Sequence, residues 1–354
     1  MSTLYPMLIE QRYDERIWGG HNLVERLGKS APRDKKIGES WEVYDENRVS
    51  NGLYAGQTIA DLRSKMGSDL MGHVPAETTF PLLTKLLDAQ DVLSVQVHPD
   101  DEEAQRLEHQ SQGKTECWYV IHAEPAAEII YGFSRDTTPD EYERLVASGE
   151  LNGILRSLLV RDGDVIYLPA RTLHAIGAGI IVYELQQTSD VTYRIYDWNR
   201  RDANGQTREL HLEKAKQVLD FHGFSRGPIR PLVQSDGRRA ILIAGPYFTE
   251  EMIATREPVE ISTYGSPVAI CALENPVAVA AAEETVALAP YSSLLVPAAA
   301  GAYSVSPNSP GDRARCLIAY VPESKEATRQ ELVSRGFAAE EVGIFLRQFD
   351  PVRE

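Results

Sequence analysis

The sequence predicts an all-β dominated protein with two small barrel-like domains, a small helical insertion and a helical C-terminal tail. Short segments rich in β-branched and aromatic residues follow one another along most of the 354 residues. Gly, Pro, Asp and Asn separate these segments, and many short strands divided by turn residues are typical of a sandwich or barrel. From about Pro228 the composition changes to mainly Ala, Val and Pro, so a second all-β unit is expected there.

Composition excludes several classes of protein. The formal net charge of -16 disfavours nucleic acid and acidic membranes as partners, because both require a positive surface. No run of about 18 apolar residues occurs, and residues 1–11 lack the basic and apolar parts of a signal peptide, so we expect a cytoplasmic protein. The chain has three cysteines, which are Cys117, Cys271 and Cys316. Because their number is odd and they are far apart in the sequence, we expect reduced thiols and no disulfide framework.

Helical patterns are scarce. Residues 58–71 carry apolar side chains at helical spacing behind Thr58, a suitable N-cap. Residues 138–159 begin with Thr-Pro-Asp-Glu, which favours a helix start, and Gly149 and Gly153 are expected to split this helix. The segment forms the core of a predicted helical insertion over about residues 134–160. A third, short helix is expected at 211–219.

Strands account for most of the remaining chain. In the first half we predict strands at 91–98, 116–122, 128–133, 164–168, 174–176, 180–187 and 191–198. In the second half we predict strands at 239–244, 247–254, 268–273, 277–282, 292–297 and 314–320. The tail is expected to be a helix–turn–helix with Gly336 at its turn.

We therefore divide the chain into a domain of residues 1–225, a second β domain of residues 226–322 and a helical tail of residues 323–354. No histidine follows His222, so the second domain lacks the residues for a metal site. A structural or dimerising role is expected for it, and the protein is expected to be a monomer or a homodimer.

Two predicted strands place polar side chains on a face that should be buried. Because side chains alternate along a strand, Gln96 and His98 share one face. Burying an unsatisfied polar group costs on the order of 1–3 kcal/mol. A metal ion would satisfy the side chains of both Gln96 and His98. On the next strand Lys114, Glu116 and Trp118 share a face, and a buried Glu116 needs a cation. That cation could be a metal, Lys114 or an arginine.

A third segment carries His174. Gly163 starts a strand, Pro169 ends it, and a tight turn returns the chain through His174. A glycine, a proline six residues on and a histidine five residues later resemble the second motif of the cupin superfamily. Arg171 stands where that motif usually has glycine. In cupins of this type a His-x-His pair and a glutamate supply the other three metal ligands.

In this sequence Gln96, His98 and Glu116 occupy those three ligand positions. The resemblance therefore implies one divalent metal ion held by Gln96, His98, Glu116 and His174. Zinc, Mn, Fe, Co or Ni suits two histidines with oxygen ligands, and no thiolate selects among them.

Two further strands add reactive groups. Glu184 shares a face with Val182 and Gln186, and Arg194 shares a face with Thr192 and Tyr196. An inward Glu184 and an inward Arg194 could form a buried ion pair. They could equally act on a substrate beside the metal.

The combined motifs resemble type I mannose-6-phosphate isomerase in its short bacterial form. The matching segments, in chain order, are Ile17-Trp18-Gly19-Gly20, Gly38-Glu39-Ser40-Trp41-Glu42, residues 82–101 with Lys85 and Gln96-Val97-His98-Pro99-Asp100, Gly113-Lys114-Thr115-Glu116, Tyr131-Gly132-Phe133 and residues 163–200. This resemblance implies two cupin-type jelly-roll β-barrels, the second of them degenerate. It implies zinc as the metal, one ion per chain, with Mn, Co or Fe as substitutes.

The resemblance also implies an activity and its residues. Mannose 6-phosphate and fructose 6-phosphate would interconvert through a cis-enediol, with a base moving a proton between C2 and C1. Arg194 would stabilise the charge on the enediolate oxygens. Glu184 is the preferred base and Lys114 the second candidate. Lys85, Lys114 and Arg194 would bind the substrate, although both lysines could instead balance the charges of Glu116 and Glu184.

Three other functions are compatible with these residues. An iron-dependent cupin oxygenase would need a redox-active metal, which the ligands allow. A non-catalytic sugar-binding or structural bicupin would need neither the inward lysines nor the inward arginine. An isomerase of the same mechanism could act on another, unphosphorylated aldose.

Overall fold

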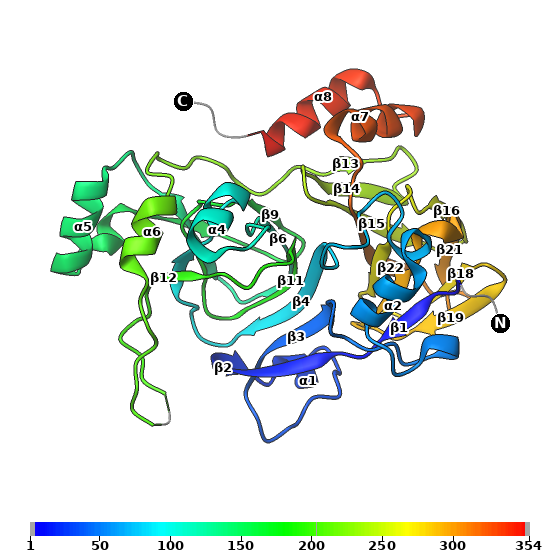
Figure 1. Cartoon of the computed structure of the whole chain (residues 1–354), viewed down its shortest axis with the longest axis horizontal. Helices are drawn as coiled ribbons and strands as arrows, with labels where there is room; N and C mark the ends of the chain where they lie inside the picture. The colour runs from blue at the N-terminus through cyan, green and yellow to red at the C-terminus, as the bar shows by residue number, and fades with distance from the viewer. Residues whose placement is uncertain (1–3, 203, 351–354) are drawn as a thin grey trace.

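The computed structural model describes residues 4–202 and 204–350 and contains two β-sandwiches side by side (Figure 1). One sheet of the first sandwich consists, in spatial order, of β2 (Arg12–Gly20), β3 (Ile37–Val43), β4 (Leu82–Ala89), β11 (Ile180–Gln187), β6 (Glu116–Ala123) and β9 (Val165–Leu168). The facing sheet consists of β12 (Tyr193–Tyr196), β5 (Val95–Val97), β10 (His174–Ile176), β7 (Glu128–Phe133) and β8 (Leu155–Leu159).

The second sandwich has the same two-layer plan. Its larger sheet consists of β1 (Met7–Ile9), β20 (Ser293–Val296), β17 (Val268–Ala272), β22 (Ala314–Tyr320), β15 (Thr249–Thr255), β14 (Arg239–Ala244) and β13 (Leu232–Val233). Its smaller sheet consists of β16 (Val259–Ser262), β21 (Ala302–Pro307), β18 (Val277–Ala281) and β19 (Glu284–Leu288). All pairs of neighbouring strands are antiparallel, and within the described ranges hydrogen bonds close neither sandwich into a continuous barrel.

Short helices connect and cover these sheets. They are α1 (Asn22–Glu25), η1 (Gly52–Tyr54), α2 (Ile59–Met66), α3 (Ser68–Met71), α4 (Asp101–Glu108), α5 (Pro139–Ser148), η2 (Leu151–Ile154), α6 (Leu212–Val218), η3 (Ala298–Ala300), α7 (Lys325–Ser334), α8 (Ala339–Leu346) and η4 (Arg347–Phe349). None of the helices in the described part of the chain is long and apolar enough to cross a membrane.

The six-stranded and seven-stranded sheets pack against each other, so one buried apolar cluster lies between the sandwiches, in addition to the clusters within each sandwich. Leu86, Tyr183 and Leu185 on the first sheet join Cys271 and Leu317 on the second in one buried cluster. All eight residues of β4 and all eight of β11 are buried, because both faces of this sheet are covered. The N-terminal strand β1 pairs with β20, so the start of the chain completes the second sandwich. The domain boundaries at 225 and 322 stay predictions.

Most predicted elements are confirmed. β7, β10, β11, β14 and β22 have the predicted bounds, and Thr58 caps α2 through a reciprocal capping box with Asp61. The three cysteines are free and buried. The predicted helix over 138–159 is partly wrong. Helix α5 ends at Ser148 with Gly149 as its C-cap, which agrees with the predicted split, but residues 155–159 form the edge strand β8, which pairs with β7.

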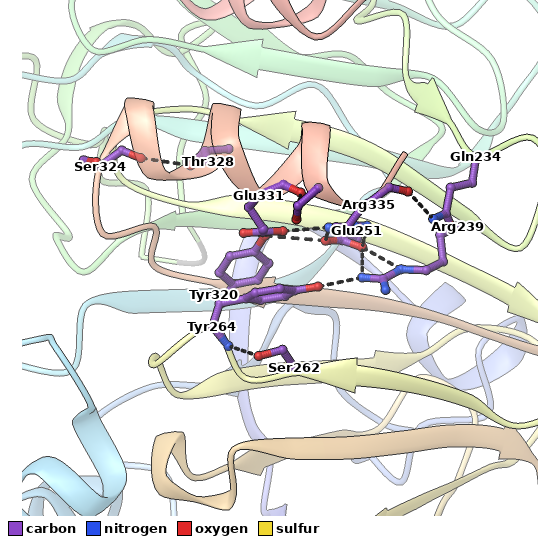
Figure 2. Close-up of polar contacts among 11 residues, drawn as sticks. Gln234, Arg239, Glu251, Ser262, Tyr264, Tyr320, Ser324, Thr328, Glu331 and Arg335 are labelled. Atoms are coloured by element: carbon purple, nitrogen blue, oxygen red, sulfur yellow. Dashed lines mark hydrogen bonds and ion pairs between the residues drawn. The ribbon is translucent and has the colours of Figure 1, made fainter. Parts of the chain in front are cut away.

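The tail has the predicted helix–turn–helix form, with Gly336 at φ 92° between α7 and α8. The last four residues of the predicted tail, 351–354, lie outside the described residues. Figure 2 shows Arg335, which follows α7, in contact with both Glu251 and Glu331. Arg239 of β14 binds the same Glu251 carboxylate, which is completely buried.

Candidate active site

The inner faces of the first sandwich bring the predicted site residues together in two rows. On the five-stranded sheet Arg194, Gln96 and His174 are register partners on β12, β5 and β10. On the six-stranded sheet Lys85, Glu184 and Trp118 are register partners on β4, β11 and β6. The alternation of side chains along these strands therefore places both rows in the interior, as the sequence predicts.

Three of the predicted metal ligands form a compact cluster. Ligand atoms of His98, Glu116 and His174 all lie within 4.8 Å of one another, and the three residues are buried. The Nε2 atoms of both histidines lie 3.4 Å from the Glu116 carboxylate. Burial lowers the pKa of both histidines, which keeps the imidazoles neutral, the form that binds metal.

The hydrogen bonds of the histidines fix their orientation. His98 Nδ1 lies 2.8 Å from the carbonyl of Val191, and His174 Nδ1 lies 2.9 Å from the carbonyl of Thr172. A carbonyl accepts only from a protonated nitrogen, so each Nε2 carries a lone pair directed inward. This is the usual arrangement of a metal-binding histidine with a backbone carbonyl behind it.

The atoms of the cluster fit a cation. Within the described residues His98 Nε2 and both Glu116 oxygens are buried without a hydrogen-bond partner. Lys114 Nζ forms an ion pair with Glu116 Oε1 over 2.8 Å, which offsets part of the charge of this carboxylate. The Gln96 amide lies 3.3 Å from His174 Nε2, and a half-turn of that amide exchanges its nitrogen for its oxygen. Buried lone pairs left unsatisfied are costly, and a divalent ion would satisfy them together.

Two lysines accompany the buried carboxylates. Lys85 Nζ lies 3.4 Å from Glu184, which also accepts a hydrogen bond from Trp118. Burial raises the pKa of Glu184, and the charge of Glu116 adds to this effect. Burial lowers the pKa of Lys114, but Glu116 and Glu184 outweigh burial, so the pKa of Lys114 is raised overall. The structure pairs Glu184 with Lys85, not with Arg194, so the buried ion pair considered above does not form.

A cavity of about 410 Å³ lies against these rows, which is within the usual size of small-molecule sites. Its lining includes the predicted residues Lys85, Gln96, Lys114, Glu184 and Arg194. The predicted inward direction of Tyr196 is wrong, because the register shifts after Arg194. Tyr196 lines a separate small pocket near Val146 and Leu151.

Sequence reasoning did not assign five other residues of the cavity wall, which are Arg16, Trp18, Glu39, Asp190 and Arg208. Trp18 and Glu39 lie inside the motifs around residues 17–20 and 38–42, so those motifs were a usable signal. Arg16 packs directly against Gly38. A Cβ atom added to Gly38 would lie 2.5 Å from the Cβ atom of Arg16, so a larger residue at position 38 would clash with Arg16. No local pattern marks Arg208, which lies beyond the last site strand.

The chain matches one family of known proteins. Residues 7–117 match the family model of the phosphomannose isomerase type I catalytic domain. Mannose-6-phosphate isomerase ManA of Bacillus subtilis is 44% identical over 222 residues, which are 62% of this chain and 69% of that protein. Mannose-6-phosphate isomerase of Streptococcus mutans is 39% identical over 249 residues, 69% of this chain and 77% of that protein. The chain belongs to the type I phosphomannose isomerase family.

The fold agrees over nearly the whole chain. The crystal structure of the mannose 6-phosphate isomerase from Bacillus subtilis superposes with a TM-score of 0.81 at 32% identity, covering 90% of this chain and 100% of that one. A zinc-bound mannose 6-phosphate isomerase has the same fold, with a TM-score of 0.73 at 14% identity over 90% of this chain and 99% of that one. As a type I phosphomannose isomerase, the chain thus has both β-sandwiches of the solved family members.

Proposed function

We propose that this phosphomannose isomerase interconverts mannose 6-phosphate and fructose 6-phosphate at the cavity between its two rows of site residues. The observation that carries the proposal is the position of the two rows. A buried carboxylate (Glu184) and an arginine (Arg194) that pairs with no carboxylate of residues 4–202 and 204–350 line one cavity beside the candidate metal cluster. That cavity also supplies the lysines and arginines that an anionic substrate needs.

We propose Gln96, His98, Glu116 and His174 as the ligands of a zinc ion, with Mn, Co or Fe as substitutes. The two carbonyl-anchored histidines, the buried Glu116 carboxylate between them and the adjacent Gln96 amide support this assignment. A bound divalent ion would polarise hydroxyl and carbonyl oxygens of the open-chain sugar. The ligands include no thiolate that would select one of these metals, so metal analysis of the purified protein identifies the ion.

We propose Glu184 as the base. It would remove the proton from C2 of the open-chain aldose and return a proton to C1, so that a proton also passes between the oxygens on C1 and C2. Burial and the charge of Glu116 favour the protonated form of its carboxyl, which suits a group that must both accept and donate. Lys114, whose pKa is raised, is better placed to donate hydrogen bonds than to accept a proton.

Arg194 would stabilise the negative charge on the enediolate oxygens. Its Nη1 donates to the carbonyl of Glu209 and its Nε to Ser94, and these contacts hold the guanidinium at the cavity wall. No carboxylate of the described chain lies within ion-pair distance of Arg194, so its charge is available to an anion. Removing one preorganised donor of this kind lowers kcat by a factor of about 10²–10³.

The test is a coupled assay of fructose 6-phosphate formation from mannose 6-phosphate, with and without a chelator. Turnover that disappears on chelation and returns with zinc is expected. Arg194→Ala should keep a full equivalent of metal and lose most of kcat. A metal-loaded protein without turnover would refute the proposed function, and an Arg194→Ala variant with near-normal kcat would remove Arg194 from the mechanism.

A further inference from the structure

Three arginines surround one carboxylate at the edge of the cavity. Asp197, only 6% exposed, follows β12. Arg208 donates to it from Nε (2.8 Å to Oδ2) and from Nη2 to Oδ1. Arg200 donates to the same Oδ1 over 2.6 Å. One negative charge is therefore shared by two guanidinium groups, and the nearby Arg194 forms no ion pair with a carboxylate in the part of the chain that the structure describes.

The two arginines on Asp197 point to different places. Arg208 lines the cavity and leaves its Nη1 without a partner on Asp197. Arg200 does not line the cavity, since its Nη1 binds the carbonyl of Val92 and lies 3.5 Å from Asp91. The same carboxylate thus orients one arginine toward the cavity and the other away from it.

The remaining cations of the cavity are neutralised. Arg16 binds Glu39 with Nε 2.9 Å from the carboxylate, and Lys85 and Lys114 lie beside the buried Glu184 and Glu116. Asp190 also lines the cavity, where its charge acts on Arg16 and Lys114 and not on Arg194. Among the cations of the described cavity wall, Arg194 has no carboxylate within ion-pair distance, and Arg208 shares its carboxylate with Arg200. The closeness of Arg208 contributes to the lowered pKa of Arg194, second to burial. An anion bound between the two groups would relieve this repulsion.

We infer that Arg208, held in place by Asp197, is the residue that selects the phosphorylated sugar by binding its phosphate. This inference rests on the proposed function. A guanidinium fixed on one edge by a carboxylate loses little freedom when its other edge binds a second anion. Charge-assisted hydrogen bonds from arginine to phosphate are among the stronger polar contacts in proteins. Lys85 and Lys114 are poorer candidates for the phosphate because each already balances a buried glutamate.

The chain offers a matched pair of variants, Arg208→Gln and Arg200→Gln. Both remove one guanidinium from Asp197, but only the first removes a group from the cavity wall. For Arg208→Gln we expect KM for mannose 6-phosphate to rise at least about tenfold, with kcat within about threefold of the parent, because binding contacts distant from the reacting carbons affect binding more than chemistry. Inhibition by inorganic phosphate should weaken by a similar factor. Arg208→Lys, which retains the charge, should give an intermediate KM.

Arg200→Gln should change KM and the phosphate inhibition constant less than twofold. Equal effects of Arg200→Gln and Arg208→Gln would overturn the inference. They would show that removing either arginine from Asp197 is enough to weaken binding, whether or not that arginine lines the cavity. An unchanged KM in Arg208→Gln, or a loss confined to kcat, would also overturn it. If Arg208→Gln does not fold, the KM and inhibition constant of Arg208→Lys decide on the same terms. A parent enzyme without turnover of mannose 6-phosphate would refute the proposed function instead, while phosphate binding measured by calorimetry would still test Arg208.

Discussion

Replacing Arg335 by methionine tests what holds the C-terminal helices on the second sandwich. Methionine keeps most of the volume of the side chain and removes the charge. Arg335 lies 2.7 and 2.9 Å from the two oxygens of Glu251 and 2.8 Å from Glu331, and its side chain is only 11% exposed (Figure 2). Removing one partner of a buried ion pair costs about 3–5 kcal/mol. Because Arg239 still binds Glu251, we expect a loss of about 3 kcal/mol, at the lower end of that range.

The assay is urea unfolding followed by far-UV circular dichroism, with Arg329→Met as the control. Arg329 is on the same helix, is 44% exposed and lies 3.8 Å from Glu326, so its loss should cost less than about 1 kcal/mol. The double variant Arg335→Met with Glu251→Gln should be less destabilised than the sum of the two single variants. Equal unfolding midpoints for Arg335→Met and Arg329→Met would refute the assignment of a buried ion-pair network at this position.

Two further predictions concern pH and metal. Burial raises the pKa of Glu250 to about 8, above its value in the unfolded chain. Between about pH 4.5 and pH 8 the folded state therefore binds one proton more than the unfolded state at this carboxyl. The free energy of unfolding should fall as the pH rises through this range, by up to about 1.4 kcal/mol per pH unit. Glu250→Gln should flatten this slope in urea titrations at pH 5, 6, 7 and 8, and an unchanged slope would show that Glu250 is not the titrating group. Removing the metal should lower the melting temperature, and zinc at 100 times its dissociation constant should restore about 2.7 kcal/mol. The alanine variant of His98 should show no such zinc response in differential scanning fluorimetry, whereas a response equal to that of the parent would exclude His98 as a ligand.

Strands rich in β-branched and aromatic residues were predictable from the sequence, whether or not both of their faces are buried. β7 and β10 carry the turn residues and β-branched residues that mark a strand, and their bounds agree. β11 is buried along its whole length and was predicted, whereas the equally buried β4 was not, because its sequence Leu-Leu-Thr-Lys-Leu-Leu-Asp-Ala contains one β-branched residue and no aromatic residue. Residues 155–159 were expected to be helical, since nothing local distinguishes an edge strand from a helix end there. Pairing with β7 decides their conformation.

The site shows a similar division. Side-chain alternation was enough to place Gln96 and Glu184 in the interior, because it depends only on local strand geometry. The wrong direction of Tyr196 has a local cause that alternation cannot reveal, the register shift after Arg194. Arg208 could not be found from the sequence, because its position depends on how the segment before α6 returns to the cavity. Long-range contacts of this kind leave no periodic pattern.

The packing of the six-stranded sheet on the seven-stranded sheet limits how the enzyme can be divided. A fragment ending near residue 225 would contain every proposed metal ligand. It would also expose Leu86, Tyr183 and Leu185 to water and leave β1 without β20, the partner that covers its backbone. Exposed apolar sheet faces and unpaired strand edges favour aggregation. A minimal catalytic fragment therefore cannot be made by truncation alone, and engineering it would require polar substitutions across that sheet face.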